Sequence, residues 1–321
     1  MQHCYELCRV QLHDHTVVMF FISNRFVNTI TDAMSVTPTT FVASVNTPVL
    51  RQPSNVSKSS GYASGYDWTP AEPISVPEEQ LLACPALQLE LRELIGQGAF
   101  GKVFKACEAN ECRKVVKVQI LKDKKAAKRF SREVEFMRTA SNSDFGPRLF
   151  EACITDGTRL MDLFTGETVK EFRDQPSIGL TVSELWNGSL DELKLDDATW
   201  CSQIVLEKFQ ARVARMHSFG IVHSDLLPKN VLYKEDSRGV VTDLIPTDFG
   251  ISFYATEFRD FPIEKQEWAF WYNLKDTTQP TWQVIEDTPE LSNATLQDVQ
   301  QNPFILDDPI IALLSRICTT L

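Results

Sequence analysis

The chain has 321 residues, of which 43% are hydrophobic and 23% are charged, so it carries enough apolar side chain for a substantial core. Its formal net charge is −11. Because surfaces that bind nucleic acids or anionic membranes need an excess of Lys and Arg, this charge argues against both kinds of partner. At this length we expect one large folded unit and a less ordered segment.

The N-terminal part of the chain shows no recognisable site. Cys4, Cys8, His13 and His15 do not have the spacing of a common zinc site. The apolar run at 17–22 is too short to span a bilayer, and nothing frames it as a signal peptide. The eight cysteines include no Cys-x-x-Cys pair, which predicts reduced thiols and an intracellular location, cytoplasmic or nuclear.

Patterning divides the chain near residue 85. Residues 1–33 alternate weakly and are compatible with a strand, whereas 34–79 are rich in Ser, Thr, Pro, Val and Asn, as a linker would be. We therefore expect residues 1–85 to form an N-terminal extension that is largely disordered or weakly structured, and 86–321 to form the folded domain.

The first half of that domain has the pattern of a sheet with one helix. A charged helix is predicted at 126–140, where apolar residues recur at helical spacing before a Gly-Pro stop. The segments rich in β-forming residues are separated by turn residues, which favours antiparallel pairing. They lie at 89–95, 101–106, 115–121, 148–154 and 177–184.

The second half turns helical. Residues 199–218 carry an apolar stripe of Ile204, Val205, Phe209, Val213 and Met216, and Gly220 ends the helix. The aromatic-rich segment 267–274 predicts a second core helix. Strands followed by helices imply an α+β fold with two lobes, a small β-rich N-lobe at about 86–184 and a helical C-lobe at about 189–321. Clefts between lobes are common ligand sites.

A glycine-rich motif lies between two of the predicted strands. Gly96, Gly98 and Gly101 form a Gly-x-Gly-x-x-Gly pattern between Ile95 and Val103. A dinucleotide-binding loop would open a helix here, but β-forming residues follow, which favours a hairpin folded over phosphates. Glycine lets backbone N–H groups approach a polyanion closely.

A lysine sits inside the next apolar strand. Lys117 follows Gly101 by 16 residues, and a charge in this context indicates contact with the α- and β-phosphates. A carboxylate on the following helix would orient its ammonium group. We favour Glu133 over Glu135 for that role.

The most specific signal is the segment 221–232, IVHSDLLPKNVL, followed by Asp248-Phe249-Gly250. Phosphoryl transfer needs a group that accepts the proton of the substrate hydroxyl, and hard Mg²⁺ ions need carboxylate and neutral oxygen ligands. Asp225, Asn230 and Asp248 supply these three types of group, in an order and spacing that chance does not explain.

With these motifs the chain resembles the eukaryotic protein kinase family over about residues 89–253. The resemblance implies a two-lobed kinase fold, with the glycines covering ATP and Ile95 and Val103 lining the same nucleotide site. Lys117 corresponds to the family's strand lysine and Glu133 to its helical partner. The loop residues with implied functions are Asp225 as catalytic base, Lys229 as a second catalytic group, Asn230 and Asp248 as Mg²⁺ ligands, and His223 as a buttress.

The resemblance also places the hinge at 182–190. It puts Ser183 at the gatekeeper position and assigns hydrogen bonds with adenine to the backbone of Glu184 and Trp186. It departs from the family at Ser224, where many members have an arginine that pairs with a phosphorylated loop. Only 71 residues follow Gly250, without an Ala-Pro-Glu motif, which predicts an abbreviated C-lobe, as in some viral or atypical kinases.

The implied function is a protein kinase that uses Mg²⁺ and ATP, with serine or threonine favoured over tyrosine as acceptor. Two alternatives remain open. The loop at 223–230 is also similar to that of choline and ethanolamine kinases, small-molecule phosphotransferases that share the fold. A pseudokinase that binds partners without catalysis is the other, although every group that phosphoryl transfer needs is present.

Overall fold

The computed structural model describes residues 7–12, 15–20, 84, 89–98, 101–164, 170–193 and 200–319. The chain divides into two compact units, residues 1–52 and 53–321. In the first unit β1 (Leu7–Leu12) pairs antiparallel with β2 (His15–Phe20). The predicted linker at 34–79 lies outside the described residues.

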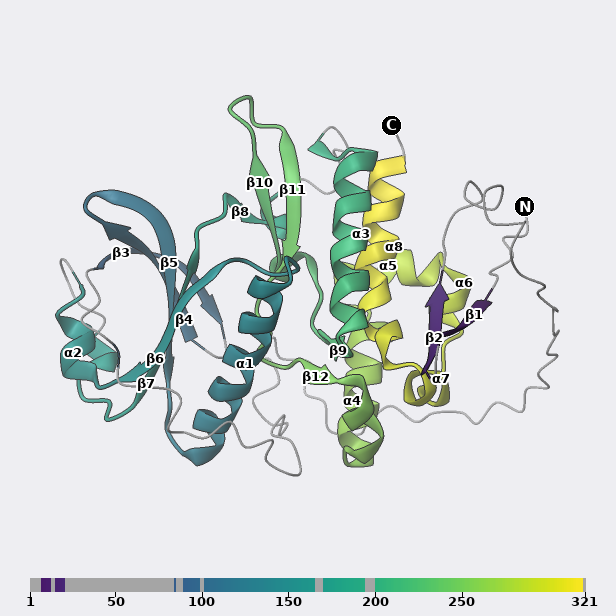
Figure 1. Cartoon of the computed structure of the whole chain (residues 1–321), viewed down its shortest axis with the longest axis horizontal. Coiled ribbons are helices and arrows are strands. Elements are labelled where there is room, and N and C mark those ends of the chain that lie inside the picture. The colour runs from purple at the N-terminus through teal and green to yellow at the C-terminus, as the bar shows by residue number, and fades with distance from the viewer. Residues whose placement is uncertain are drawn as a thin grey trace. The chain divides into compact units, whose positions relative to one another are not determined.

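The second unit begins with a five-stranded antiparallel sheet (Figure 1). The strand order is β3-β4-β5-β7-β6. Each predicted strand is confirmed within a few residues at its ends. The bounds are Glu90–Gly98 for β3, Gly101–Glu108 for β4, Glu111–Ile120 for β5, Leu149–Thr155 for β6 and Ile178–Glu184 for β7.

The helix α1 (Lys124–Asn142) packs against this sheet. Asp123 caps its first turn by accepting a hydrogen bond of 2.7 Å from the Ala126 amide. Phe130 of α1 is fully buried, and a Cβ built on Gly179 of β7 would lie 2.7 Å from its ring. The glycine therefore allows the helix to approach the sheet closely. Between β6 and β7 lie α2 (Gly157–Met161) and the 3-10 turn η3 (Lys170–Phe172).

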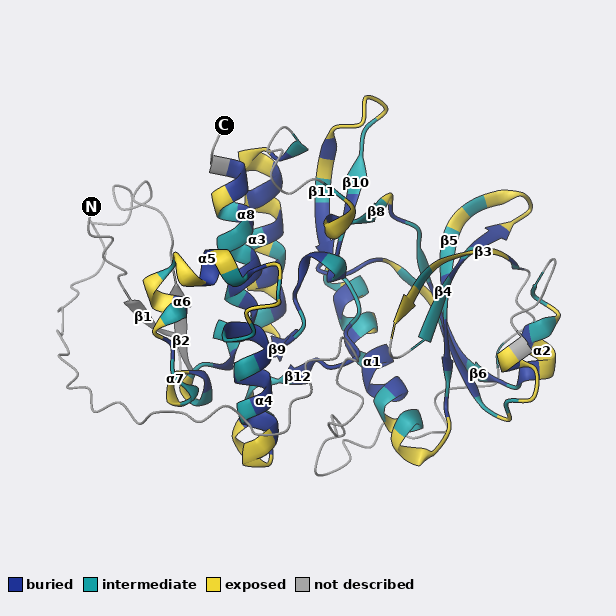
Figure 2. Ribbon diagram, turned by 180° about the vertical axis from the view of Figure 1, so that it is seen from behind, coloured by how far each residue is buried: buried dark blue, intermediate teal, exposed yellow. Residues whose placement is uncertain are grey.

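The C-lobe is built around two long helices, α3 (Gln203–Ser218) and α8 (Asp308–Thr319), which pack into one hydrophobic core (Figure 1). Three short strands form a sheet beside them, in the order β11 (Val241–Pro246), β10 (Val231–Glu235) and β8 (Gly188–Ser189). Figure 2 shows that the turn between β10 and β11 is exposed at its tip. β9 (Ile221–Val222) pairs with β12 (Phe253–Tyr254).

Further helices and helical turns complete this lobe. They are η4 (Leu190–Glu192), η6 (Pro228–Asn230), η7 (Ala255–Asp260), α4 (Ile263–Leu274), α5 (Trp282–Glu286), α6 (Pro289–Ser292), α7 (Leu296–Gln301) and η8 (Pro303–Asp307). The aromatic core helix predicted at 267–274 is confirmed as part of α4, where Trp268, Phe270 and Tyr272 are buried.

The prediction of the apolar stripe on α3 is wrong for one residue. The side chains at positions 205, 209, 213 and 216 are buried, whereas Ile204 is 66% exposed. Successive helical residues are rotated by about 100°, so Ile204 lies outside the narrow arc that the other four share. The sequence pattern predicted the buried face of α3 correctly but wrongly included Ile204, which lies beside that face.

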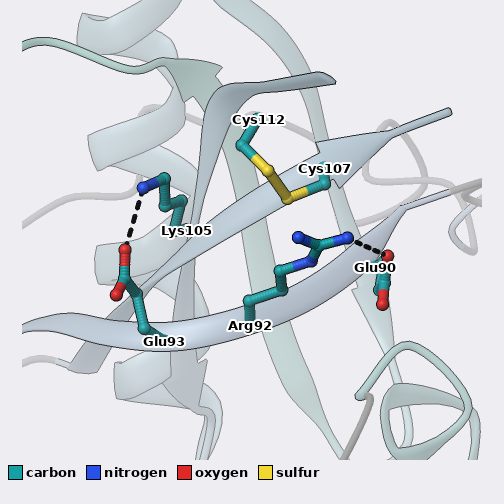
Figure 3. Close-up of a disulfide and its surroundings, with 6 residues drawn as sticks. All are labelled: Glu90, Arg92, Glu93, Lys105, Cys107 and Cys112. Atoms are coloured by element: carbon teal, nitrogen blue, oxygen red, sulfur yellow. Dashed lines mark hydrogen bonds and ion pairs between the residues drawn. A yellow bond between two sulfur atoms is a disulfide. The ribbon is translucent and has the colours of Figure 1, made fainter. Parts of the chain in front are cut away.

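The prediction of reduced thiols is contradicted for six of the eight cysteines. The structure pairs Cys84 with Cys153, Cys107 with Cys112 and Cys201 with Cys318. Figure 3 shows the second pair joining β4 to β5, near the ion pairs of Arg92 with Glu90 and Lys105 with Glu93. Two of the pairs are 69 and 117 residues apart in the chain, so no local spacing pattern reveals them. The intracellular location stays a prediction.

Among the helices of the described ranges, none combines the length and apolar character that crossing a membrane requires.

The disulfide between Cys201 and Cys318 joins the residues before α3 to the end of α8, and its loss should destabilise the C-lobe. In the chain-entropy model a bridge over 117 residues stabilises by about 2–3 kcal/mol more than one over five. The double substitution Cys201→Ser/Cys318→Ser is therefore expected to lower the unfolding free energy more than Cys107→Ser/Cys112→Ser. Urea denaturation of the two variants without reductant measures this. Equal unfolding free energies for the two variants would contradict it.

Candidate active site

Lys117 is the centre of a cluster that joins three elements. Its Nζ, on β5, lies 2.7 Å from Oε1 of Glu133 on α1 and 2.7 Å from Oδ1 of Asp248, after β11. Gln119 donates a 2.7 Å hydrogen bond to the other oxygen of Glu133. Burial opposes the charged form of the lysine, but Asp248 and Glu133 outweigh it and raise the pKa of Lys117. The ammonium group is therefore charged and fixed.

Asp248 is held by the backbone as well as by the lysine. Its φ of +60° is unusual for a residue other than glycine, and such angles persist where neighbouring contacts impose them. The ring of the next residue, Phe249, is buried at 5.0 Å from that of His223 and 6.4 Å from that of Phe145. Burial favours the protonated carboxyl, yet the adjacent Lys117 ammonium lowers the pKa of Asp248. The side chain stays 39% exposed, so it is accessible to a ligand.

Asp225 lies in the loop between β9 and η6, with both carboxylate oxygens engaged. Asn230 Nδ2 donates to Oδ2 at 2.8 Å, and Lys229 Nζ lies 3.3 Å from the same oxygen. The hydroxyl of Tyr272, from α4, donates to Oδ1 at 2.9 Å. Burial raises the pKa of Asp225, while Lys229 and the Tyr272 hydrogen bond act in the opposite direction.

The glycine-rich motif is a β-hairpin, as the sequence pattern predicts. Gly96 and Gly98 belong to β3 and Gly101 to β4, where Gly98 pairs with Gly101. Val103 pairs in register with Lys117 on the next strand, so the two side chains share one face of the sheet. Ile95 is 46% exposed.

A protein kinase domain model matches residues 89–272, which include all of these groups. The chain belongs to the protein kinase family. Serine/threonine-protein kinase PknD of Chlamydia muridarum is 25% identical over 187 residues, 56% of this chain and 18% of that protein. The PknD of Chlamydia trachomatis serovar L2b is 25% identical over 171 residues, 51% of this chain and 17% of that protein.

A shorter match is stronger in identity. Serine/threonine-protein kinase CG17528 of Drosophila melanogaster is 41% identical over 51 residues, which are 16% of this chain and 7% of that protein. The matched regions thus cover 7–18% of the length of these relatives, so the similarity extends over a small part of each of them.

The segment predicted to be the hinge begins at the end of β7. Ser183 pairs with Val115, two residues from Lys117 on the same face. The Glu184 amide donates to the Arg148 carbonyl at 2.9 Å, so a hydrogen bond from this residue to adenine would have to use its carbonyl. Its side chain forms an ion pair of 2.6 Å with Lys234, whose Nζ lies 4.4 Å from the centroid of the Trp186 ring. The hinge is thereby fastened to β10.

The donor set fits Mg²⁺ bound with nucleotide phosphates. Asn230 Nδ2 donates to the Asp225 carboxylate and, at 2.7 Å, to the Asp225 carbonyl. This leaves the side-chain amide oxygen of Asn230 available, and Mg²⁺ prefers oxygen ligands of this type. Asp248 adds an accessible carboxylate. No group of three or more His, Cys, Asp or Glu within the described part of the chain could hold a metal ion. Two protein ligands supplemented by phosphates and water are typical for Mg²⁺.

Asp307 binds the backbone of the loop that contains Asp225. The sequence did not reveal this function. Its fully buried carboxylate accepts hydrogen bonds of 2.9 Å from the backbone amides of both His223 and Ser224. His217 Nε2 lies 3.0 Å from the same carboxylate, and His223 Nε2 contacts the Thr247 carbonyl at 2.8 Å. The available signal was the pair of acids Asp307 and Asp308 in an otherwise apolar stretch at 303–314.

The segment after Asp248 holds α1 in place. Arg132, next to Glu133, forms a bidentate ion pair with Glu257 of η7. The Tyr254 hydroxyl donates to Glu135 at 2.8 Å, so that carboxylate faces β12 and not Lys117. Burial, followed by the bond to Glu135, raises the pKa of Tyr254 to about 12. These contacts keep Glu133 directed at the lysine.

The hairpin requires glycine at position 101 but not at 98. A Cβ on Gly101 would lie 2.4 Å from the Val118 carbonyl oxygen, and its φ is +152°. A Cβ on Gly98 would meet nothing within 4 Å. Gly101→Ala should therefore lower the unfolding free energy by about 1–3 kcal/mol, whereas Gly98→Ala should change it by less than about 0.5 kcal/mol. Chemical denaturation without nucleotide tests this, and a larger loss for Gly98→Ala would refute it.

Proposed function

We propose that this chain is an active protein kinase, which transfers the γ-phosphoryl group of Mg²⁺-bound ATP to a serine or threonine hydroxyl of a protein. One observation carries the proposal. The residues whose chemistry the reaction requires form two neighbouring clusters. Lys117 contacts Asp248, and Asp225 contacts both Lys229 and Asn230. The charge of Lys229 also acts on Asp248, which links the two clusters electrostatically. Their protonation states suit these functions, since the lysine is held charged and Asp248 is held ionised.

The nucleotide would lie between the hairpin and the hinge. The backbone at Gly96, Gly98 and Gly101 covers the phosphates, with Ile95 and Val103 on either side of the motif. Lys117 binds the α- and β-phosphates, and Glu133 keeps its ammonium group oriented. The backbone of Glu184 and Trp186 hydrogen-bonds adenine.

Asp225 orients the acceptor. Its carboxylate accepts the hydrogen bond of the incoming hydroxyl, and takes up the proton as the new bond to phosphorus forms and the bond to the ADP oxygen breaks. Lys229, beside Asp225, stabilises negative charge on the transferring group. Asn230 and Asp248 hold the metal, which supplies further neutralisation of phosphate charge when bound.

The choice of a serine or threonine acceptor rests on the relatives, whose names state that specificity. Two alternative functions, a choline or ethanolamine kinase and a pseudokinase, predict different products when labelled ATP is supplied with several acceptors. Transfer of label to choline or ethanolamine would select the first. Binding of ATP without transfer to any acceptor would select the second.

Substitution of the phosphate and metal ligands should abolish transfer. We expect Asp248→Ala and Lys117→Met to reduce the rate of γ-phosphoryl transfer by about a hundred- to a thousandfold or more, because the first removes a metal ligand and the second removes the charge that positions the α- and β-phosphates. Transfer of labelled phosphate to the chain itself and to generic protein acceptors measures this.

The matched control is Lys105→Met, which removes an exposed lysine of the neighbouring strand that pairs with Glu93. It should leave the transfer rate within about twofold, as surface ion pairs contribute little. Full activity of both Asp248→Ala and Lys117→Met would show that the site is wrongly assigned.

A further inference from the structure

The two oxygens of the Asp225 carboxylate are used unequally. Oδ2 faces two donors, Asn230 at 2.8 Å and Lys229 at 3.3 Å. Oδ1 accepts one hydrogen bond, from the Tyr272 hydroxyl at 2.9 Å. Because a carboxylate oxygen has two lone-pair sites, Oδ1 has room for one more donor, whereas Oδ2 already accepts from Asn230 and faces the Lys229 ammonium group. An acceptor hydroxyl would therefore bind to Asp225 through Oδ1, next to the phenol of Tyr272.

Tyr272 is well placed to fix that oxygen. It lies on α4 and is 8% exposed, and its ring stacks on that of Trp268 with centroids 4.7 Å apart and planes at 11°. The following residue, Asn273, donates a 3.0 Å hydrogen bond to the carbonyl of Ser224, immediately before Asp225. Two consecutive residues of α4 thus contact the catalytic loop, so the phenol has a defined position.

We propose that Tyr272 is a positioning residue for phosphoryl transfer, whose hydroxyl holds Asp225 Oδ1 so that its remaining lone pair faces the acceptor hydroxyl. This inference rests on the proposed kinase function. The torsion that rotates a carboxylate has a broad energy minimum, so anchors on Oδ2 alone leave the plane of the group poorly determined. A second anchor on Oδ1 removes this freedom, and small misplacements of a reacting group reduce the rate strongly.

The alternative is that Tyr272 serves packing alone. Its ring belongs to the aromatic core of the C-lobe, to which Trp268 and Phe270 also contribute. A packing function resides in the ring, whereas a positioning function resides in the hydroxyl. Tyr272→Phe separates the two, because it retains the ring and removes one oxygen atom.

The experiment compares wild type and Tyr272→Phe for steady-state transfer to a generic serine-containing protein acceptor and for thermal unfolding. The anchor that fixes the reacting carboxylate is lost, so kcat should fall roughly 10- to 100-fold. The KM for ATP should stay within about twofold, since the Tyr272 hydroxyl donates to Asp225, a group assigned to the acceptor and not to the nucleotide. The unfolding midpoint should fall by no more than about a few degrees, because the buried ring is retained.

The matched control is Tyr233→Phe, which removes the hydroxyl of another tyrosine that is 9% exposed, on β10. It should leave kcat unchanged. An unchanged kcat for Tyr272→Phe would overturn the inference about Tyr272. In that case the activity of the wild type would still support the proposed kinase function. A kcat that falls only together with the unfolding midpoint would assign Tyr272 to packing. If wild type bound Mg²⁺-ATP but transferred no phosphate, both proposals would fail.

Discussion

The arrangement of the kinase domain depends on one ammonium group shared by two carboxylates. Lys117 lies on the central strand of the sheet, and it contacts Glu133 from the helix and Asp248 from the C-lobe side. Breaking a partly buried pair of this kind leaves an uncompensated charge, which is strongly unfavourable. The three groups carry a net charge of about −1, which a bound cation would neutralise. The same cluster therefore connects the lobes and leaves a net negative charge that favours a bound cation.

Such a cluster functions only if α1 keeps its orientation, and a second set of contacts provides this. Arg132 is beside Glu133 in the chain, and it pairs with Glu257 while its guanidinium lies over the rings of Phe136 and Tyr254. The carboxylate at 257 is a permanent part of the chain, so this contact does not require an added phosphate. Ser224 is consistent with that arrangement, because it lacks the charge with which many family members bind a phosphorylated loop.

Local patterns predicted most of the fold and the residues that we propose to act on ATP. Each of these signals spans only a few consecutive residues. They are the strands with alternating side chains, the glycine motif and the loop around Asp225. The chemistry of phosphoryl transfer constrains the residue types in the last two. The contacts that the sequence did not reveal are long-range. Tyr272 is 47 residues from Asp225, and Asp307 is 84 residues from His223. The same holds for the disulfide between Cys201 and Cys318, since packing of α3 on α8 decides which thiols meet.

The unusual C-lobe shows which of its features the catalytic loop requires. Ser224 has a φ of +63°, a strained angle that persists only where partners on both sides of the peptide hold it. Its amide is bound by Asp307 of η8 and its carbonyl by Asn273 of α4. Neither element lies within the sequence motifs that identify the family, yet together they satisfy the buried backbone groups of the loop. The loop therefore requires an acceptor for the Ser224 amide and a donor for the Ser224 carbonyl. Asp307 and Asn273, both of which follow Gly250 in the chain, supply them.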